Sequence, residues 1–546
     1  MHTLWFEMGE WKNQLYFGDN LAILRDRIGD ESVDLIYLDP PFNSNATYNV
    51  LFDARDGEMS SSQITAFEDT WQWGEESAAT YHELVTSGPP MLATLLGSLH
   101  DFLGNSNMMA YLAMMAARLI ELHRVLRDTG SLYLHCDSVA SHYLKLLLDA
   151  VFGPKQFCRE IVWKCTSAHS NAKTYGNIHQ NLLFYTKTSS FTFNVQYTPY
   201  EQEYIDTYYR YTDEDGRRFM SSDLVGHKGV NKIYEWHGIE RPWRYPAERM
   251  DELEKTGRIF WTKNGFPRYK RYLDEMPGLP AQTIWTDIQP VVSWSTEGLG
   301  YPTQKPEALL RRIILSSSNE EDVVLDPFCG CGTAVVVAED TARRWIGIDV
   351  AYMAIALIRR RLEETFSALS PFDVDGVPKS LQDARAMAHS GPHGRYQFQW
   401  WAIDTLGARP ANEQRKGPDR GVDGQILFID DTTGKPKSIL VQVKSGKVSR
   451  SDVATLVGDM ENQGHVIGVL VTLEKPTDKM EKEALAAGFY EGPGFKGRDP
   501  VRRVQILTAA DLFAGKRVKF YQMGNQTFKE AITKDEKPKL QMRFGE

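Results

Sequence analysis

Two segments of the chain place an acidic residue directly after a short apolar run, where it could do chemistry. The first, Asp322–Thr333, reads DVVLDPFCGCGT, in which the apolar run ends at Asp326 before a turn through two glycines. Small residues let a backbone approach a ligand closely, and the helix-like stretch that follows would offer unpaired N–H groups. The next apolar run ends at Asp349, whose carboxylate could accept hydrogen bonds from ribose hydroxyls. The alternative is a tight turn without a ligand, and the second acid favours a nucleotide site.

The second segment, Asp39-Pro40-Pro41-Phe42, directly follows the apolar run Val33–Leu38. An exocyclic amine of a nucleobase is a poor nucleophile because its lone pair is delocalised into the ring. The Asp39 carboxylate and the Pro40 carbonyl could accept hydrogen bonds from its N–H groups and localise that lone pair during methyl transfer. Phe42 could stack on an extruded base. A proline-rich turn that only ends a strand is the alternative, and the glycine segment in the same chain argues against it.

Together the two segments resemble DNA amino-methyltransferases that use S-adenosylmethionine. Thr303–Glu307 (TQKPE) and Val324–Thr333 (VLDPFCGCGT) match the cofactor segment of that family, except that Cys331 stands where serine is usual. The order is the β-type order, in which the catalytic motif comes first, a target-recognition region follows and the cofactor motif comes last. The resemblance covers about residues 12–365 apart from the variable middle.

The resemblance implies a Rossmann-like α/β fold, S-adenosylmethionine as cofactor and adenine N6 in DNA as the acceptor, since the family links Asp at the position of Asp39 to adenine. Cytosine N4 and RNA are the alternatives. Protein-glutamine methyltransferases carry Asn at this position and place the cofactor motif first, so the sequence excludes them. The implied catalytic residues are Asp39, Pro40, Pro41 and Phe42. The implied cofactor-binding residues are Asp19 (in YFGDN), Gln304, Lys305, Pro306, Asp326, Pro327, Phe328, Cys329, Gly330, Gly332, Thr333 and Asp349.

A second constellation lies in the C-terminal part, where residues 417–424 read GPDRGVDG and residues 441–445 read VQVKS. Asp423 at the start of one strand and Lys444 near the end of the next would meet at one edge of a small sheet. An acid that holds a divalent cation and a lysine beside the attacking water make a workable phosphodiesterase site. Gln442 would offer an amide oxygen in place of a second carboxylate.

This pattern resembles the Mrr-like branch of the PD-(D/E)xK nuclease superfamily, whose motif is D…QxK. The resemblance implies an Mg²⁺-dependent endonuclease with Asp423, Gln442 and Lys444 as catalytic residues, the first two as metal ligands. The motif supplies one carboxylate for Mg²⁺, Asp423, and Glu413 or Asp419 could assist it. Because a single carboxylate binds Mg²⁺ less firmly than two, an inactive DNA-binding module and an unrelated fold are the alternatives. The first hypothesis is therefore a fused restriction–modification enzyme, and the second is a solitary methyltransferase with a DNA-holding tail.

The elements around these segments alternate between strands and helices, which predicts a parallel sheet. Strands are expected at 33–38, 131–135, 322–325, 345–348, 424–429, 438–443 and 466–473, and helices at 108–127, 139–151, 306–317, 333–340, 353–362, 396–406 and 452–461. We expect a catalytic half at 1–164, a target-recognition region at 165–295, a cofactor-binding half at 296–366, a linker at 367–395 and a nuclease-like domain at 396–546. The middle region is rich in Tyr, Trp and Arg, lacks periodicity and is expected to be mostly irregular.

Composition limits the class of protein further. The chain has 546 residues, of which 42% are hydrophobic and 25% charged, which excludes a disordered or collagen-like chain. The net charge of −10 gives no bulk signature of nucleic-acid binding, so any DNA surface must be local. The few cysteines indicate a reducing compartment, and no apolar run approaches the roughly 18–20 residues of a membrane span. We expect a soluble cytoplasmic enzyme with double-stranded DNA as partner, alone, as a homodimer or with a separate restriction-system subunit.

Overall fold

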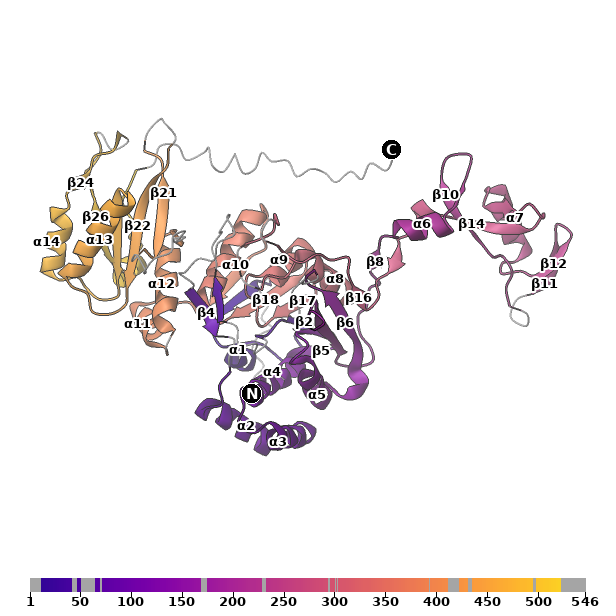
Figure 1. Cartoon of the computed structure of the whole chain (residues 1–546), viewed down its shortest axis with the longest axis horizontal. Coiled ribbons are helices and arrows are strands. Elements are labelled where there is room, and N and C mark those ends of the chain that lie inside the picture. The colour runs from indigo at the N-terminus through magenta and orange to yellow at the C-terminus, as the bar shows by residue number, and fades with distance from the viewer. Residues whose placement is uncertain are drawn as a thin grey trace. The chain divides into compact units, whose positions relative to one another are not determined.

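The computed structural model describes most of the chain (Figure 1). The described residues are 11–41, 71–167, 174–227, 232–292, 295–299, 301, 303–391, 393–409, 422–430, 435–493 and 497–521, with the backbone of 47–50, 64–68 and 410. They fall into two units, a main unit (Met1–Thr192 and Ile288–Glu546) and an inserted unit (Phe193–Asp287). Phe42, Glu413 and Asp419, which the sequence singles out, lie outside the described residues.

The main unit is built on a mixed sheet whose strands follow the order β6-β7-β5-β2-β17-β18-β1-β19. The parallel strands are β1 (Asn13–Phe17), β2 (Val33–Leu38), β5 (Leu126–Cys136), β17 (Val323–Asp326), β18 (Arg344–Asp349) and β19 (Phe372–Asp375). The antiparallel edge is formed by β6 (Phe157–Lys164) and β7 (His179–Thr186). Every residue of β2 is buried, because helices cover both faces of a parallel sheet and its central strands are apolar throughout.

Helices pack on both faces of this sheet, with α1, α4 and α5 on one side and α8, α9 and α10 on the other (Figure 1). Their bounds are α1 (Asn20–Arg27), α4 (Asn107–Val125), α5 (Ser141–Phe152), α8 (Glu307–Ser317), α9 (Thr333–Asp340) and α10 (Tyr352–Thr365), and α2 (Glu75–Ser87) and α3 (Pro90–Leu103) pack against α4. This is the Rossmann-like α/β fold that the sequence predicts. The strand at 33–38 and the helix at 333–340 have the predicted bounds, and the other predicted elements of this part differ by a few residues at their ends.

A smaller α/β domain, the C-terminal domain, extends from α11 to α15. Its elements are α11 (Leu381–His389), α12 (Gly394–Thr405), β20 (Arg409–Pro410), β21 (Gly424–Phe428), β22 (Lys437–Lys444), α13 (Arg450–Gln463), β23 (Ile467–Thr472), α14 (Asp478–Ala486), β24 (Phe489–Tyr490), β25 (Val501–Arg502), β26 (Val504–Thr508) and α15 (Ala509–Phe513). The sheet order is β20-β21-β22-β23-β26. Alternate residues of β22 serve two cores: Val441 packs with α12 residues, and Leu440 packs with α13 residues.

The segment expected to be a linker, 367–395, is folded, which corrects that prediction. Its β19 pairs in parallel with β1, so it is an edge strand of the main sheet, and its α11 packs on α12. The pattern of β19, FDVD, lacks the apolar run that marked the buried strands, because an edge strand needs less apolar surface. Among the residues that the structure describes, no helix is both long and apolar enough to span a bilayer.

The inserted unit is more regular than the sequence suggests. It contains β8 (Tyr197–Thr198), α6 (Gln202–Tyr208), β9 (Tyr211–Thr212), β10 (Arg218–Ser222), β11 (Ile233–Trp236), β12 (Ile239–Pro242), α7 (Ala247–Lys255), β13 (Ile259–Trp261), β14 (Pro267–Tyr272), β15 (Leu279–Pro280) and β16 (Ile284–Trp285). A four-stranded antiparallel sheet runs β13-β14-β10-β9. Several of its aromatic residues are core residues, since Trp236, Trp243 and Tyr209 are buried.

Candidate active site

Three acidic residues meet where neighbouring strands of the main sheet end. Asp39 follows β2, Asp326 ends β17 and Asp349 ends β18, and β17 lies between the other two strands. Because the carboxyl ends of parallel strands share one edge, residues far apart in the sequence become neighbours there. This edge opens into a cavity of about 410 Å³. The predicted residues that line it are Asp19, Asp39, Pro40, Pro41, Gln304, Lys305, Asp326, Pro327, Phe328, Cys329, Gly330, Thr333 and Asp349.

Two of the predicted cofactor residues, Pro306 and Gly332, have positions beside the cavity and do not line it. Pro306 is the N-cap residue of α8, where its fixed φ suits a helix start. Gly332 adopts φ +76°, and a Cβ at this position would lie 2.5 Å from Cγ1 of Ile358 in α10. The glycine is therefore required by both the left-handed backbone and the close approach of α10.

Lys305 and Asp39 form an ion pair in the wall of the cavity. The Lys305 Nζ lies 2.5 Å from the Asp39 Oδ2, and the two side chains are only 8% and 16% exposed. Lys305 Nζ also donates to the Thr303 carbonyl at 3.2 Å. The sequence predicts Lys305 as a cofactor residue. It lines the cavity with the other predicted cofactor residues, and its charge also pairs with the acid of the catalytic motif. A cation at this distance favours the ionised form of a carboxylate.

The glycine loop, residues 327–332 between β17 and α9, is held by the Asp349 carboxylate at the end of β18. The Asp349 Oδ2 accepts a hydrogen bond from Gly330 N and the Oδ1 accepts one from Ala351 N, both at 2.8 Å. Burial raises the pKa of Asp349 to about 6 and raises the pKa of Asp326 well above its usual range. Asp326 Oδ1 accepts from Phe328 N at 3.1 Å. Each carboxylate oxygen has two lone pairs, so these acids can still accept hydrogen bonds from a ligand.

Both carboxylate oxygens of Asp19, which was predicted to bind the cofactor, accept hydrogen bonds from the chain itself. Its Oδ1 caps α1 by accepting from Leu21 N and Ala22 N, and its Oδ2 pairs with Arg118 at 2.6 Å. Arg118 also donates to Asn20, whose Nδ2 donates 2.7 Å to the Pro327 carbonyl in the glycine segment. This network ties the N-terminal strand and α4 to the cofactor segment.

Several cavity residues were not predicted from the sequence. They include Asn20, Tyr37, Trp71, Arg118, Tyr301 and His393. Arg118 could have been identified from the sequence. It is the one arginine inside the apolar run of α4, and a buried cation needs a partner. Tyr37 donates to or accepts from His135 Nδ1 at 2.9 Å, and this buried pair could not be foreseen because it joins β2 to β5.

The second predicted constellation is only partly assembled. Strands β21 and β22 pair as expected, with Gly424 opposite Val441. Asp423 Oδ1 accepts from Gln399 Nε2 at 2.8 Å and its Oδ2 accepts from Val443 N at 2.5 Å, so this carboxylate contacts α12. Gln442 is 2% exposed, and its Nε2 donates 2.8 Å to Asp459 of α13. The two side chains therefore bond to helices on opposite faces of the sheet.

The donor set does not build a magnesium site in the part of the chain that the structure describes. Asp423 is a single carboxylate whose oxygens both accept hydrogen bonds from the chain, and Gln442 is directed at Asp459. No cluster of three or more His, Cys, Asp or Glu side chains suited to a metal occurs among the described residues. Lys444 is exposed at the end of β22.

A glycine loop and acids at the strand ends of an α/β sheet are typical of enzymes that bind a nucleotide-containing cofactor. Residues 33–360 match the N6_N4_Mtase model, described as DNA methylase. Because this match covers more than half of the chain, the chain belongs to the N6/N4 DNA methylase family. Residues 395–512 match the family described as NACHT-associated inactive Restriction Endonuclease 1, which does not support the Mrr-like active nuclease predicted above.

Three curated proteins with similar sequences carry names from DNA modification. Type II methyltransferase M.EcaI of Enterobacter cloacae is 28% identical over 356 residues, which cover 64% of this chain and 69% of that protein. The Type III restriction-modification enzyme StyLTI Mod subunit of Salmonella typhimurium is 28% identical over 342 residues, covering 59% of this chain and 49% of that protein. DNA adenine methyltransferase YhdJ of Escherichia coli is 25% identical over 357 residues, covering 65% and 84%. Each of these three matches leaves more than a third of this chain uncovered.

Proposed function

We propose that this protein transfers a methyl group from S-adenosylmethionine to the N6 amino group of adenine in double-stranded DNA. The observation that carries the proposal is the position of Asp39 in the wall of the cavity that also contains the glycine loop. A methyl acceptor held by Asp39 would thus lie beside a cofactor held by the loop. The name of one relative, DNA adenine methyltransferase YhdJ, supports the choice of adenine.

The residues of the cavity fit the cofactor. Gly330, at φ +49°, has no side chain between the loop backbone and the cavity, and Asp349 beneath it can accept hydrogen bonds from ribose hydroxyls. Phe328 and Pro327 provide apolar surface for a base, and the acidic groups suit the positive charge of a sulfonium and an amino group. When bound, S-adenosylmethionine supplies an electrophilic methyl group.

The remaining chemistry belongs to the residues of the catalytic motif. The Asp39 carboxylate and the Pro40 carbonyl accept hydrogen bonds from the two N6–H groups, which localises the nitrogen lone pair toward the methyl group. Lys305 holds the Asp39 carboxylate in place through their ion pair. Phe42 would stack on the adenine, which must leave the duplex at a cost of a few kcal/mol.

The target would be recognised by the inserted unit, where we propose that exposed aromatic and basic side chains contact DNA. Tyr208, Tyr245 and Trp261 are exposed, as are Arg244 and Arg271. Base edges and phosphates are read by such side chains. The broader region 165–295 of the sequence prediction also contains β7, which belongs to the main sheet, so we restrict the recognition region to Phe193–Asp287.

For the C-terminal domain we propose a non-catalytic DNA-binding role. The description of the matching family as inactive supports it, and so does the absence of an assembled Mg²⁺ donor set among the described residues. Lys444 and Lys447 are exposed after β22, where they could contact phosphates. The substitution Lys444→Ala should then weaken DNA binding equally across sequences and reduce its salt dependence.

The proposed activity is tested with labelled S-adenosylmethionine and three acceptors: duplex DNA, the same DNA with inosine for every adenine, and duplex RNA. We expect transfer to the first acceptor alone. Transfer to the DNA without adenine would establish cytosine N4 as the target, and transfer to RNA alone would overturn DNA as the substrate.

A further inference from the structure

One helix touches both the glycine loop and the C-terminal domain. On the loop side, Ile358 of α10 fills the space beside Gly332. On the other side, Tyr352 N donates to Gln397 Oε1 at 2.7 Å, and the Tyr352 hydroxyl donates to Asp404 Oδ2 at 3.0 Å. Both acceptors belong to α12, the first long helix of the C-terminal domain. A shift of α12 would therefore be transmitted to α10, which supports the loop.

The contact between α10 and α12 also includes an ion pair and apolar packing. The Arg359 NH2 lies 2.8 Å and 2.7 Å from the two Asp404 oxygens, and the Asp404 side chain is only 18% exposed. Met353 of α10 and Phe398 and Trp401 of α12 belong to one continuous buried core. Fixed apolar packing and a half-buried ion pair make this a defined interface, unlike the mobile junction that a linker would give.

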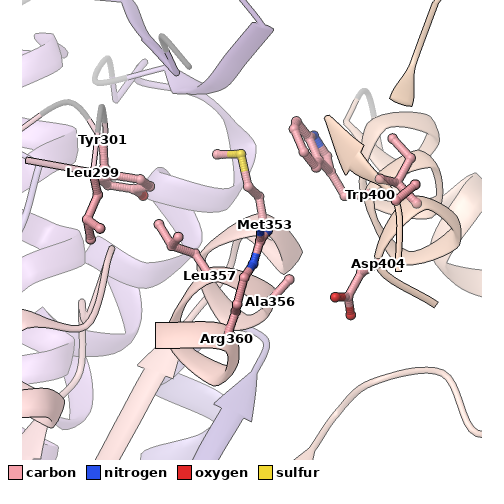
Figure 2. Close-up of a pocket in the computed structure, with 10 residues that line it drawn as sticks. Leu299, Tyr301, Met353, Ala356, Leu357, Arg360, Trp400 and Asp404 are labelled. Carbon is pink, nitrogen blue, oxygen red and sulfur yellow. The ribbon is translucent and has the colours of Figure 1, made fainter. Parts of the chain in front are cut away.

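Tyr301 joins this interface to the cofactor cavity. It lines the cavity described above and also a second, small cavity of about 30 Å³ between α10 and α12. In the view of Figure 2, the Met353 side chain of α10 lies between the rings of Tyr301 and Trp400. The Tyr301 ring is 3.4 Å from the place of a Cβ on Gly330. Burial and the nearby carboxylate of Asp349 raise the pKa of Tyr301, so its hydroxyl is neutral at physiological pH.

The C-terminal domain also supplies a residue to the cavity itself. His393, directly before α12, is among the lining residues together with Gly330 and Asp349. The histidine is partly buried, and its ring can donate or accept a hydrogen bond. A domain that lay outside the methyltransferase would have no side chain in this position.

We propose that the C-terminal domain forms one wall of the cofactor site, so that S-adenosylmethionine binding and the docking of α12 on α10 strengthen each other. The inference rests on the proposed function, since it requires that the cavity binds this cofactor. Such coupling is reciprocal: if docking strengthens cofactor binding, the cofactor must strengthen docking by the same factor. The cofactor would in this way set the rigidity with which the DNA-binding domain is held.

The test compares cofactor affinity in the full chain and three variants by calorimetry. Asp404→Ala removes the partner of Arg359 and Tyr352, and His393→Ala removes the cavity side chain while leaving the interface intact. Glu474→Ala is the matched control, since Glu474 pairs with Arg385 at 2.9 Å within the C-terminal domain and away from α10. We expect both test variants to weaken binding at least about fivefold, the lower end of typical coupling, and the control to change it less than about twofold.

A second measurement uses the unaltered protein and does not depend on the folding of any variant. Hydrogen exchange with and without S-adenosylmethionine should show slower exchange in α12 and no change in α13, which packs on the opposite face of the C-terminal sheet. Wild-type affinity in both test variants, or unchanged exchange in α12 at saturating cofactor, would overturn the inference alone. If the wild type binds no cofactor, the proposed function fails and the inference fails with it.

Discussion

The ion pair between Lys305 and Asp39 leads to a prediction that separates two roles for the lysine. Lys305→Met keeps the length of the side chain and removes its charge. Loss of one member of a buried ion pair costs about 3–5 kcal/mol, and we take about 3 kcal/mol because Asp39 is 16% exposed to the cavity. If this free energy is lost from the positioning of Asp39 in the transition state, methyl transfer slows about 100-fold.

The assay is single-turnover methyl transfer at saturating DNA and cofactor, together with the dissociation constant of S-adenosylmethionine from calorimetry. We expect the rate constant to fall about 100-fold in Lys305→Met while the dissociation constant changes less than about threefold. Lys305→Arg keeps the charge and should recover part of the rate. The opposite pattern, a full rate at saturation with the affinity for S-adenosylmethionine lowered about 100-fold, would refute the role of Lys305 in positioning Asp39. It would show that Lys305 binds the cofactor.

Three further predictions concern the other predicted site residues. Asp349→Ala should weaken S-adenosylmethionine binding by about 1–3 kcal/mol, the scale of a lost charged hydrogen bond, and an unchanged dissociation constant would make this acid purely structural. Because burial raises the pKa of Asp349 to about 6 and an ionised carboxylate is the better acceptor, affinity should increase as the pH rises from about 5 to 7. Asp349→Asn should abolish this pH dependence of affinity. A pH dependence equal to that of the wild type would show that another group causes it. With Mg²⁺, neither the wild type nor Lys444→Ala should cut unmethylated duplex DNA in a gel assay, and cutting by the wild type alone would restore the nuclease hypothesis.

The central strands and the glycine loop could be predicted because their local sequence already contains the reason for their structure. Val33–Leu38 is an apolar run that two prolines end, and the helix Thr333–Asp340 starts after a glycine that must adopt a left-handed conformation. A buried parallel strand and a tight turn depend on few long-range partners, so short patterns identify them.

The parts that could not be predicted depend on partners far away in the sequence. The edge strand β19 is recognisable only through its pairing with β1, about 360 residues earlier in the chain. His393 enters the cavity because α12, which it directly precedes, docks on α10, and no local pattern encodes this docking. The direction of the Gln442 side chain could have been predicted from strand alternation. Val441 and Val443 on either side face the core that contains α12, so Gln442 must point to the other face of the sheet.

The most direct test of the account is the identity of the methylated base made by the wild type and by Asp39→Ala. Duplex DNA is incubated with S-adenosylmethionine and either protein, digested to nucleosides and analysed by mass spectrometry, with cofactor binding of both proteins checked by calorimetry. The account predicts N6-methyladenine from the wild type and none from Asp39→Ala, which still binds the cofactor. N6-methyladenine from the variant at the wild-type rate, or N4-methylcytosine as the only product of the wild type, would contradict it.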